Sequence, residues 1–102
     1  MTTLVIDSSA ISATSVNLTE DSLIIDLLDG RSVSAPLAWY PRLLHGTSSE
    51  RNNYRIIGGG EGIHWPDLDE DISVEGILAG RASGETPESF QKWLAARGQN
   101  EA

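Results

Sequence analysis

Alternation of apolar and polar residues dominates the pattern from residue 14 to residue 35. Residues 15–19 (SVNLT) alternate with period two, residues 23–28 (LIIDLL) are apolar on both faces, and residues 31–35 (RSVSA) alternate again. Period-two alternation is typical of half-buried strands, and a strand that is apolar on both faces is central. Asp29-Gly30 between the last two runs favours a two-residue type I′ turn. The pattern therefore predicts a three-stranded antiparallel meander.

A second group of strands is predicted over residues 54–57 and 62–65, with the glycines of residues 58–60 as their connection. Glycine is expected there because a tight connection needs positive φ. Residues 4–6 (LVI) form one further short apolar run, which we interpret as an edge strand or a loose arm. The side chains predicted to be largely buried are those of Val16, Leu18, Leu23, Ile25, Leu27, Val33, Ile56 and Ile63.

Capping signals predict several short helices. Prolines limit residues 36–44 to one or two helical turns, with Gly46 closing them in the left-handed region. Thr47 and Glu50 have the spacing of a capping box, which predicts a helix over residues 48–53. Ser73 is an N-cap for a helix over residues 74–79, with Gly80 following its end.

The C-terminal segment carries the signals of an amphipathic helix over residues 87–97. Thr86 is its N-cap, Pro87 is its first residue and Gly98 ends it. Phe90, Trp93 and Leu94 recur at helical spacing and form one apolar stripe. We expect this stripe to pack on its own domain with partial exposure. The alternative is a homodimer formed through this helix.

Together these elements predict a single α+β domain spanning residues 1–102. Its antiparallel sheet would hold four to six strands, with short helices and the C-terminal amphipathic helix. We expect the helices that begin at Val74 and Pro87 to cover one face of that sheet.

The chain is acidic, with a formal net charge of −8 from fifteen Asp and Glu against seven Lys and Arg. The seven basic residues are scattered, which disfavours direct nucleic-acid binding and favours a basic protein partner. There is no cysteine, so disulfides and thiolate chemistry are excluded. No apolar run approaches the length of a membrane span, and the first twenty residues carry no secretory signal. We therefore expect a cytoplasmic protein with no membrane partner.

Residues 58–71 (GGGEGIHWPDLDED) concentrate the candidate chemistry. They hold four of the ten glycines, one of the two histidines and five carboxylates. His64 with Glu61 and Asp67 could perform general acid–base catalysis if the three side chains converged. No nucleophile accompanies them, so we favour a structural histidine beside Trp65.

The same segment has partial features of metal and phosphate sites. Asp67, Asp69 and Asp71 have the spacing of the first three ligands of an EF-hand calcium loop. Ile72 and Leu78 occupy the sixth and twelfth positions, where that loop requires Gly and Glu, and this excludes an EF-hand. A looser divalent site stays open, although Asp69 and Asp71 are better interpreted as acidic residues near a helix N-terminus. The glycine run lacks the Gly-Lys-Ser/Thr ending of a phosphate loop. No cofactor and no metal ligand is predicted.

Aromatic residues are the stronger sign of an interaction surface. Trp39 and Tyr40 lie between two prolines, where complete burial of both is difficult. Trp, Tyr and Arg are frequent anchors of protein interfaces, so Trp39, Tyr40, Arg42 and Trp65 are candidate interface residues.

The order and spacing of several motifs resemble one known family. These motifs are Asp29-Gly30-Arg31, Pro36-Leu37, Tyr40-Pro41-Arg42-Leu43, Glu50-Arg51 and, most specifically, residues 58–71 followed by Ile72-Ser73-Val74. Over about residues 14–81 the chain resembles the small bacterial family called domain of unknown function 2442. Its members more often carry Trp where Tyr54 stands.

The resemblance implies an α+β fold and no agreed activity. Members of this family are often encoded beside a second small protein, in a layout similar to toxin–antitoxin pairs. Some are joined to a helix-turn-helix region, which we do not expect after Gly98. We therefore predict an interaction module, an antitoxin-like or regulatory partner of a neighbouring protein. The alternative is a small enzyme or a metal- or ligand-binding domain that uses residues 58–71.

Overall fold

The computed structural model describes residues 11–100, with side chains to residue 97. The predicted strand or arm at residues 4–6 lies outside the described residues. In chain order the elements are three strands, three short helical segments, three further strands interrupted by a single 3₁₀ turn, and two helices. None of the described helices is long and apolar enough to cross a membrane.

The first sheet is the meander that the sequence predicts. β1 (Ala13–Leu18), β2 (Ser22–Leu27) and β3 (Ser32–Pro36) are antiparallel in the order β1-β2-β3. Ile25 of the central strand is completely buried and pairs with Val16 on one side and Val33 on the other. A strand that is apolar on both faces is therefore central, as the pattern indicated.

The predicted type I′ turn between β2 and β3 is wrong. The Gly30 amide donates to the Leu27 carbonyl (3.0 Å) and the Leu27 amide donates to the Arg31 carbonyl (2.8 Å), so three residues form the loop. Gly30 has φ +93°, whereas Asp29 is not in the positive-φ region. The Asp29 carboxylate instead accepts the Arg31 amide at 3.0 Å, a local bond that stabilises the longer loop.

The second sheet lies in the other half of the domain. β4 (Arg55–Ile57), β5 (Gly62–Trp65) and β6 (Glu70–Ser73) are antiparallel in the order β4-β5-β6. The 3₁₀ turn η2 (Gly58–Gly60) joins the first two of these strands. Strand β6 was not predicted, because its carboxylates were interpreted as belonging to a helix start.

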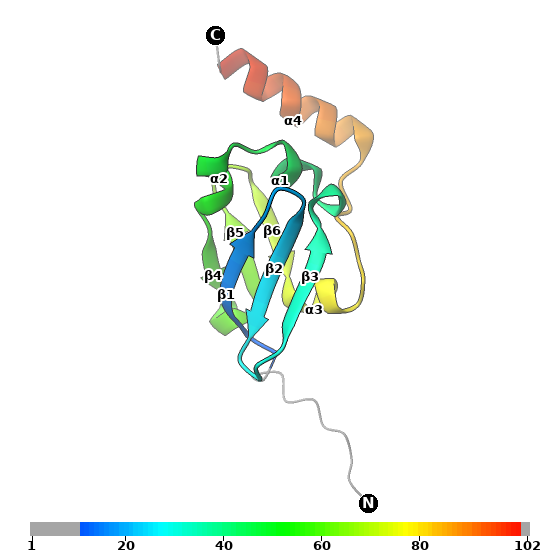
Figure 1. Cartoon of the computed structure of the whole chain (residues 1–102). Coiled ribbons are helices and arrows are strands. Elements are labelled where there is room, and N and C mark those ends of the chain that lie inside the picture. Colours follow the sequence, from blue (N-terminus) through cyan, green and yellow to red (C-terminus); the bar gives the residue numbers. More distant parts are fainter. Residues whose placement is uncertain (1–10, 101–102) are drawn as a thin grey trace, which may run out of the picture.

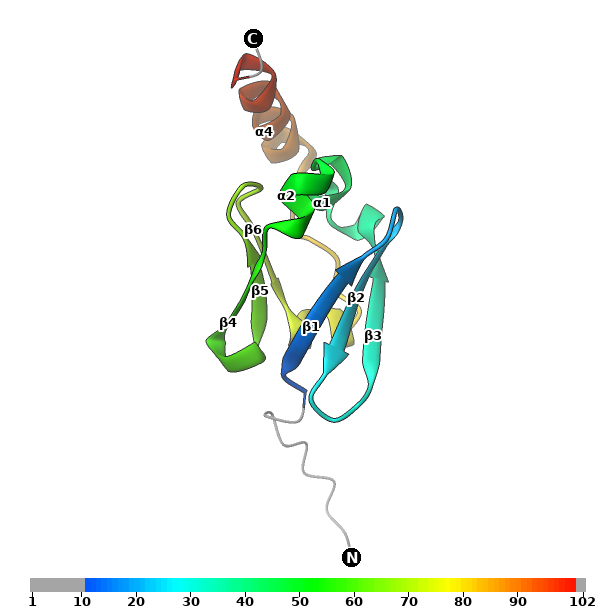
Figure 2. The same cartoon turned by 60° about the vertical axis from the view of Figure 1, so that its left-hand side comes forward.

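The prediction of one sheet with four to six strands is also wrong, since the domain has two separate three-stranded sheets. β1 and β4 are neighbours but do not form a backbone ladder. The Tyr54 hydroxyl donates to the Val16 carbonyl at 3.1 Å, so a side chain satisfies the edge of β1 at this point. Figures 1 and 2 show the two sheets as two layers that are splayed apart at one end.

The hydrophobic core lies between the two sheets and includes the short helices. Its completely buried side chains are Trp65, Leu23, Ile25, Leu37, Leu43, Ile63, Leu68 and Val74. The burial predictions for Val16, Leu23, Ile25, Leu27 and Ile63 are confirmed, and Leu18 and Val33 are partly buried against the core. The prediction for Ile56 is wrong, because β4 is an edge strand and leaves this side chain 37% exposed.

Three short helical segments connect the sheets. They are η1 (Leu37–Trp39), α1 (Pro41–His45) and α2 (Ser48–Asn52), and both bonds of the predicted capping box of α2 are present. Gly46 has φ −68°, so its predicted left-handed conformation is wrong. A Cβ atom at Gly46 would lie 3.0 Å from Leu68 Cδ1, so glycine permits a close approach of the buried Leu68.

Helix α3 (Val74–Leu78) begins and ends as predicted. The Ser73 hydroxyl accepts the Gly76 amide at 2.9 Å, and Gly80 follows the helix with φ +76°. Figure 1 shows α3 next to β3 and β6, where it closes one side of the core.

Helix α4 (Pro87–Asn100) begins at the predicted cap, where Thr86 Oγ1 accepts the Ser89 amide at 3.1 Å. It continues through Gly98, so the predicted stop is wrong; an interior glycine costs only about 1 kcal/mol. The helix does not cover a sheet face as predicted. It lies across the end of the domain, over α1 and α2 (Figure 1). Within one chain Trp93 packs against the core from there, and the choice between this packing and a homodimer stays a prediction.

Gly60→Ala tests the closest backbone contact of the fold. Gly60 is buried with φ +101°, and a Cβ atom there would lie 2.5 Å from Ser12 Cβ and 3.0 Å from the Ala13 amide. We expect a loss of about 2–4 kcal/mol in the free energy of unfolding, measured by urea denaturation. Gly59→Ala is the matched control: it has φ +66° but open space around it, and should lose about 1 kcal/mol. Equal losses would contradict the clash.

Candidate functional site

The β5–β6 hairpin presents the acidic part of residues 58–71. Pro66 begins its turn, and the Leu68 amide donates to the Trp65 carbonyl at 3.3 Å. Leu68 is completely buried and anchors the turn in the core. Asp69 has φ +49°, and it is the one described residue other than glycine with positive φ. The hairpin tip is therefore a defined turn rather than a loose loop.

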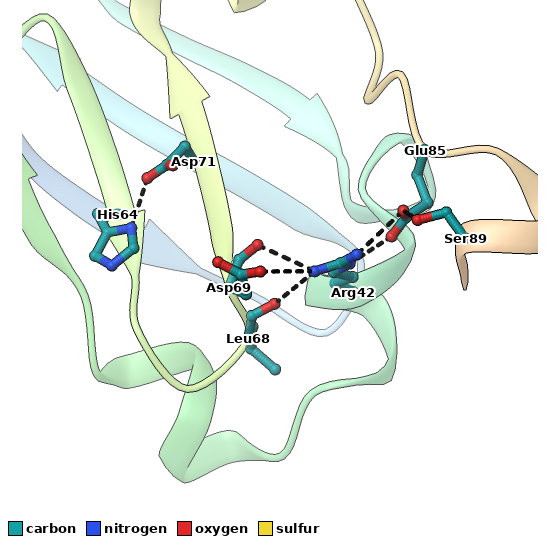
Figure 3. A network of polar contacts seen from close by, with 7 residues as sticks. All are labelled: Arg42, His64, Leu68, Asp69, Asp71, Glu85 and Ser89. Atoms are coloured by element: carbon teal, nitrogen blue, oxygen red, sulfur yellow. Dashed lines mark hydrogen bonds and ion pairs between the residues drawn. The ribbon is translucent and has the colours of Figure 1, made fainter. Parts of the chain in front are cut away.

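Arg42 on α1 connects this hairpin to the segment that precedes α4 (Figure 3). Its Nη1 group donates to the Asp69 carbonyl at 3.2 Å and to the Leu68 carbonyl at 3.5 Å. Its Nε and Nη2 groups bind both carboxylate oxygens of Glu85, the second at 3.2 Å. We call this arrangement the Arg42 clamp. A planar guanidinium suits it because its donors point in two directions at once.

The Glu85 carboxylate is bound by Arg42 and also by Ser89. Its carboxylate also accepts the Ser89 hydroxyl at 2.5 Å, which ties it to the first turn of α4. The bonds to Arg42, followed by the Ser89 bond, lower the pKa of Glu85, and the same bonds to Glu85 raise the pKa of Arg42. With side chains 15% and 9% exposed, this pair is largely withdrawn from water. It therefore forms a strong connection rather than a solvated surface pair.

Glu70 lies beside the clamp, and among the described residues its side chain forms no ion pair with Arg42. It is partly buried on β6 and lines a cavity of about 310 Å³ together with Arg42, Glu85 and Ser83. Burial raises the pKa of Glu70 to about 7, and repulsion from Glu85 and Asp71 acts in the same direction, while Arg42 opposes it. This carboxyl group therefore changes its charge near neutral pH.

His64 pairs with Asp71 across the two strands of the hairpin. The two residues are register partners, and Nδ1 of His64 lies 2.5 Å from Oδ1 of Asp71. The His64 side chain is 25% exposed and that of Asp71 is 70% exposed. His64 thus bridges β5 and β6, as the structural interpretation favoured. Asp71 lies within β6, two residues before Ser73, the N-cap of α3, and its carboxylate pairs with His64.

The arrangement required by the enzyme hypothesis does not form. Asp67 accepts the Asn53 side-chain amide at 2.9 Å, and Glu61 precedes β5 at its opposite end. Among the described residues no hydrogen bond or ion pair joins His64 to Glu61 or Asp67. Within residues 11–100 no group of three or more His, Cys, Asp or Glu side chains is placed to hold a metal ion.

The candidate aromatic anchors are mostly interior. Trp65 is completely buried and its indole N–H donates to the Arg51 carbonyl at 2.9 Å, while Tyr40 is only 3% exposed. Burial also raises the pKa of Tyr40. These two residues are therefore core residues and not exposed anchors. Trp39 is partly buried against the core.

Sequence reasoning missed the Arg42 clamp and the burial of Glu70. Arg42 and Glu85 are 43 positions apart, and no local pattern links them. A signal for Glu70 was present, because period two from Ile72 and Val74 places Glu70 on the same inward side. The acidic composition of the segment concealed that alternation.

Glu70→Gln tests the raised pKa. The unfolded chain loses this proton near pH 4.5 and the folded chain near pH 7, so the contribution of Glu70 to stability falls as pH rises between those values. Glutamine removes this penalty, and we expect the variant to gain about 2 kcal/mol relative to the unmodified chain between pH 4 and pH 8. Urea denaturation at both pH values measures it. Glu75→Gln, at an exposed glutamate, is the control, and an equal gain there would refute the assignment.

Arg42→Lys tests the clamp. An ammonium group cannot reach Glu85 and the hairpin carbonyls together, so we expect a loss of about 1–3 kcal/mol in the free energy of unfolding. Arg31→Lys is the matched control, because Arg31 forms an exposed pair with Asp29 and should leave the urea midpoint unchanged. An unchanged midpoint for Arg42→Lys would show that one point charge suffices.

Comparison with known proteins identifies the family. The fold is similar to a crystal structure of a protein of unknown function from Rhodospirillum rubrum, with TM-score 0.63 and 26% identity over 72% of this chain and 92% of that one. It is also similar to the solution structure of an uncharacterized protein from Chromobacterium violaceum, with TM-score 0.62 and 23% identity. That match covers 84% of this chain and 75% of the other. No curated protein matches the chain. The model of the family described as protein of unknown function (DUF2442) matches residues 13–83, which confirms the resemblance seen in the motifs. The chain belongs to the DUF2442 family.

Proposed function

We propose that this domain is a protein-interaction module that binds a basic partner protein through the tip of its β5–β6 hairpin. The observation that carries the proposal is the presentation of Asp67, Asp69 and Asp71 on a turn with a fixed backbone. All three residues are exposed, and the side chain of Asp69 is 90% exposed. Trp65, which precedes them, and Leu68, which lies between Asp67 and Asp69, are completely buried.

Preorganisation of the hairpin supports binding. The left-handed conformation of Asp69 is unfavourable for a residue with a side chain, and such strain is concentrated at functional sites. Arg42 holds the Asp69 carbonyl from below, at 3.2 Å. A partner that binds the tip therefore does not have to order it, which lowers the entropic cost of association.

The charge of the chain supports a basic partner. The whole chain has a formal net charge of −8, to which the three exposed aspartates of the hairpin contribute. Among residues 11–97, Asp69 lies 3.6 Å from Arg42 and Asp71 lies 2.5 Å from His64, while no salt bridge is formed by Asp67. Carboxylates so placed attract Lys and Arg of a partner and accelerate the encounter.

The partner that we propose is a small protein encoded beside this chain. The layout of neighbouring genes in the family, similar to toxin–antitoxin pairs, motivates that choice. An antitoxin-like or regulatory role would follow if the hairpin covered a functional surface of the partner.

Replacement of the three aspartates tests the proposal. Asp67→Asn, Asp69→Asn and Asp71→Asn together preserve shape, and Asn tolerates positive φ. We expect affinity for the co-encoded protein to fall at least about tenfold, mainly through a slower association rate measured by surface plasmon resonance. The unmodified complex should also weaken as salt is added.

The control removes the same number of charges elsewhere. Glu20, Glu75 and Glu88 are exposed and lie outside the hairpin. The control variant combines Glu20→Gln, Glu75→Gln and Glu88→Gln. If it weakens binding as much as the aspartate variant does, the net charge of the chain determines the affinity and the hairpin does not. If repeated affinity purification of the unmodified chain recovers no co-encoded protein, the proposal is refuted.

A further inference from the structure

Helix α4 lies outside the family-matched region and packs on a surface that lies inside it. The family match ends at residue 83, before the helix begins at Pro87. The surface under the helix is formed by α1 and α2, and its contact residues are Arg42, His45 and Glu50. We call these three residues the helix-docking face.

Two ionic pairs fix the position of the helix on this face. At one end Glu85 binds Arg42, and at the other Arg97 forms two hydrogen bonds of 2.8 Å with Glu50. These bonds lower the pKa of Glu50 to about 2, with smaller contributions from Thr47. The face is basic at one end and acidic at the other, and the helix segment has the opposite order. The charge pattern therefore specifies both the helix and its direction.

Aromatic contacts lie between the two ionic pairs. The Trp93 ring stacks on Phe90 with centroids 5.7 Å apart, and Phe90 contacts His45 at 5.1 Å. The guanidinium carbons of Arg42 and Arg97 lie 5.5 Å and 4.6 Å from the Trp93 ring centre. Phe90, Trp93 and Leu94 nevertheless remain only partly buried, and Leu44 of α1 is 40% exposed. One helix thus leaves part of the apolar surface uncovered.

The connection to α4 has a short hinge. The chain is held to the core up to Ser83, whose amide donates to the Trp39 carbonyl at 2.9 Å. From Glu85 onward it belongs to the helix, through the Ser89 bond. Gly84 lies between these two points with nothing within 4 Å of its Cβ position. Rotation at one glycine therefore moves Glu85 and the whole helix together.

We propose that the helix-docking face is a homodimer interface, on which α4 of a second copy replaces the chain's own α4. The contacts described above join the segment from Glu85 to Arg97 to the helix-docking face. The same segment of a second copy can therefore form each of these contacts in place of the chain's own segment. In the exchanged dimer Arg42 binds the partner's Glu85, and Glu50 binds the partner's Arg97. Short hinge loops favour this type of exchange. The inference does not depend on the hairpin or its partner.

Complementary charge reversal tests the exchange. In Glu50→Arg the face and the helix both carry arginine at this contact, and in Arg97→Glu both carry glutamate. Each variant alone should be monomeric by sedimentation velocity, because its own contact is repulsive. A mixture restores both contacts only through exchange, so we expect a 1:1 heterodimer to appear on mixing.

The double variant Glu50→Arg with Arg97→Glu is the matched control. It also lacks the carboxylate that completes the α2 capping box, so its circular dichroism shows whether that loss alone unfolds the domain. We expect it to fold and to have the same monomer–dimer equilibrium as the unmodified chain. A mixture of the single variants that remains monomeric overturns the proposal, and so does a single variant that dimerises alone.

A second measurement uses the unmodified chain, for the case in which Glu50→Arg does not fold. Isotope-labelled and unlabelled chains are mixed at high concentration, and NMR detects contacts between the two populations. We expect contacts between His45 of one copy and the partner's Phe90. Contacts within a single copy alone, at every concentration, refute the exchange.

Discussion

The arrangement of α1, the β5–β6 hairpin and α4 depends on the hydrogen bonds of the Arg42 guanidinium. Arg42 belongs to α1, and its side chain binds both the β5–β6 hairpin and Glu85 in the segment before α4. The N–H groups of Arg42 donate to two backbone carbonyls of the hairpin and to the Glu85 carboxylate. A shift of the hairpin or of Glu85 relative to α1 would therefore break at least one of these hydrogen bonds. Because the Glu85 pair is largely withdrawn from water, breaking it leaves charge in a poorly solvated place. The hairpin and the helix are therefore mechanically connected.

Carboxylates have two opposite roles around this clamp. Glu50 and Glu85 are stabilised as anions by arginine, and the pKa of each is lowered. Glu70 is close to the same arginine but has no hydrogen bond to it, and burial raises its pKa. An acidic chain thus places some of its charge in fixed ion pairs and carries one carboxyl group that is poorly solvated. The aspartates of the hairpin are exposed although each has a neighbour within the domain, and their exposure is the basis of the proposed function.

The family-matched region and α4 differ in how they are held. Residues 13–83 contain both sheets, the short helices and the completely buried side chains. The helix adds charged and aromatic contacts at one end, and its apolar residues stay partly exposed. A core held by complete burial is rigid, whereas an element held by a few side chains at a glycine hinge is released at a lower free-energy cost. That difference is why the proposed exchange between two copies involves the helix and not a strand.

The sequence alone determined the features that depend on neighbouring residues. The meander around Ile25, the capping box of Thr47 and Glu50, the caps at Ser73 and Thr86, and the family motifs of residues 58–71 were all readable. Each depends on period-two alternation or on hydrogen bonds within a few positions, so the local chain contains all the information.

Tertiary structure decided the rest. The division into two sheets, the burial of Trp65 and Tyr40, the exposure of Ile56 and the route of α4 depend on residues that are distant in sequence. Arg42 meets Glu85 across 43 positions, and Glu50 meets Arg97 across 47. Whether a charged or aromatic side chain is buried depends on what the folded chain places beside it, because the free energy of burial is a property of the surroundings.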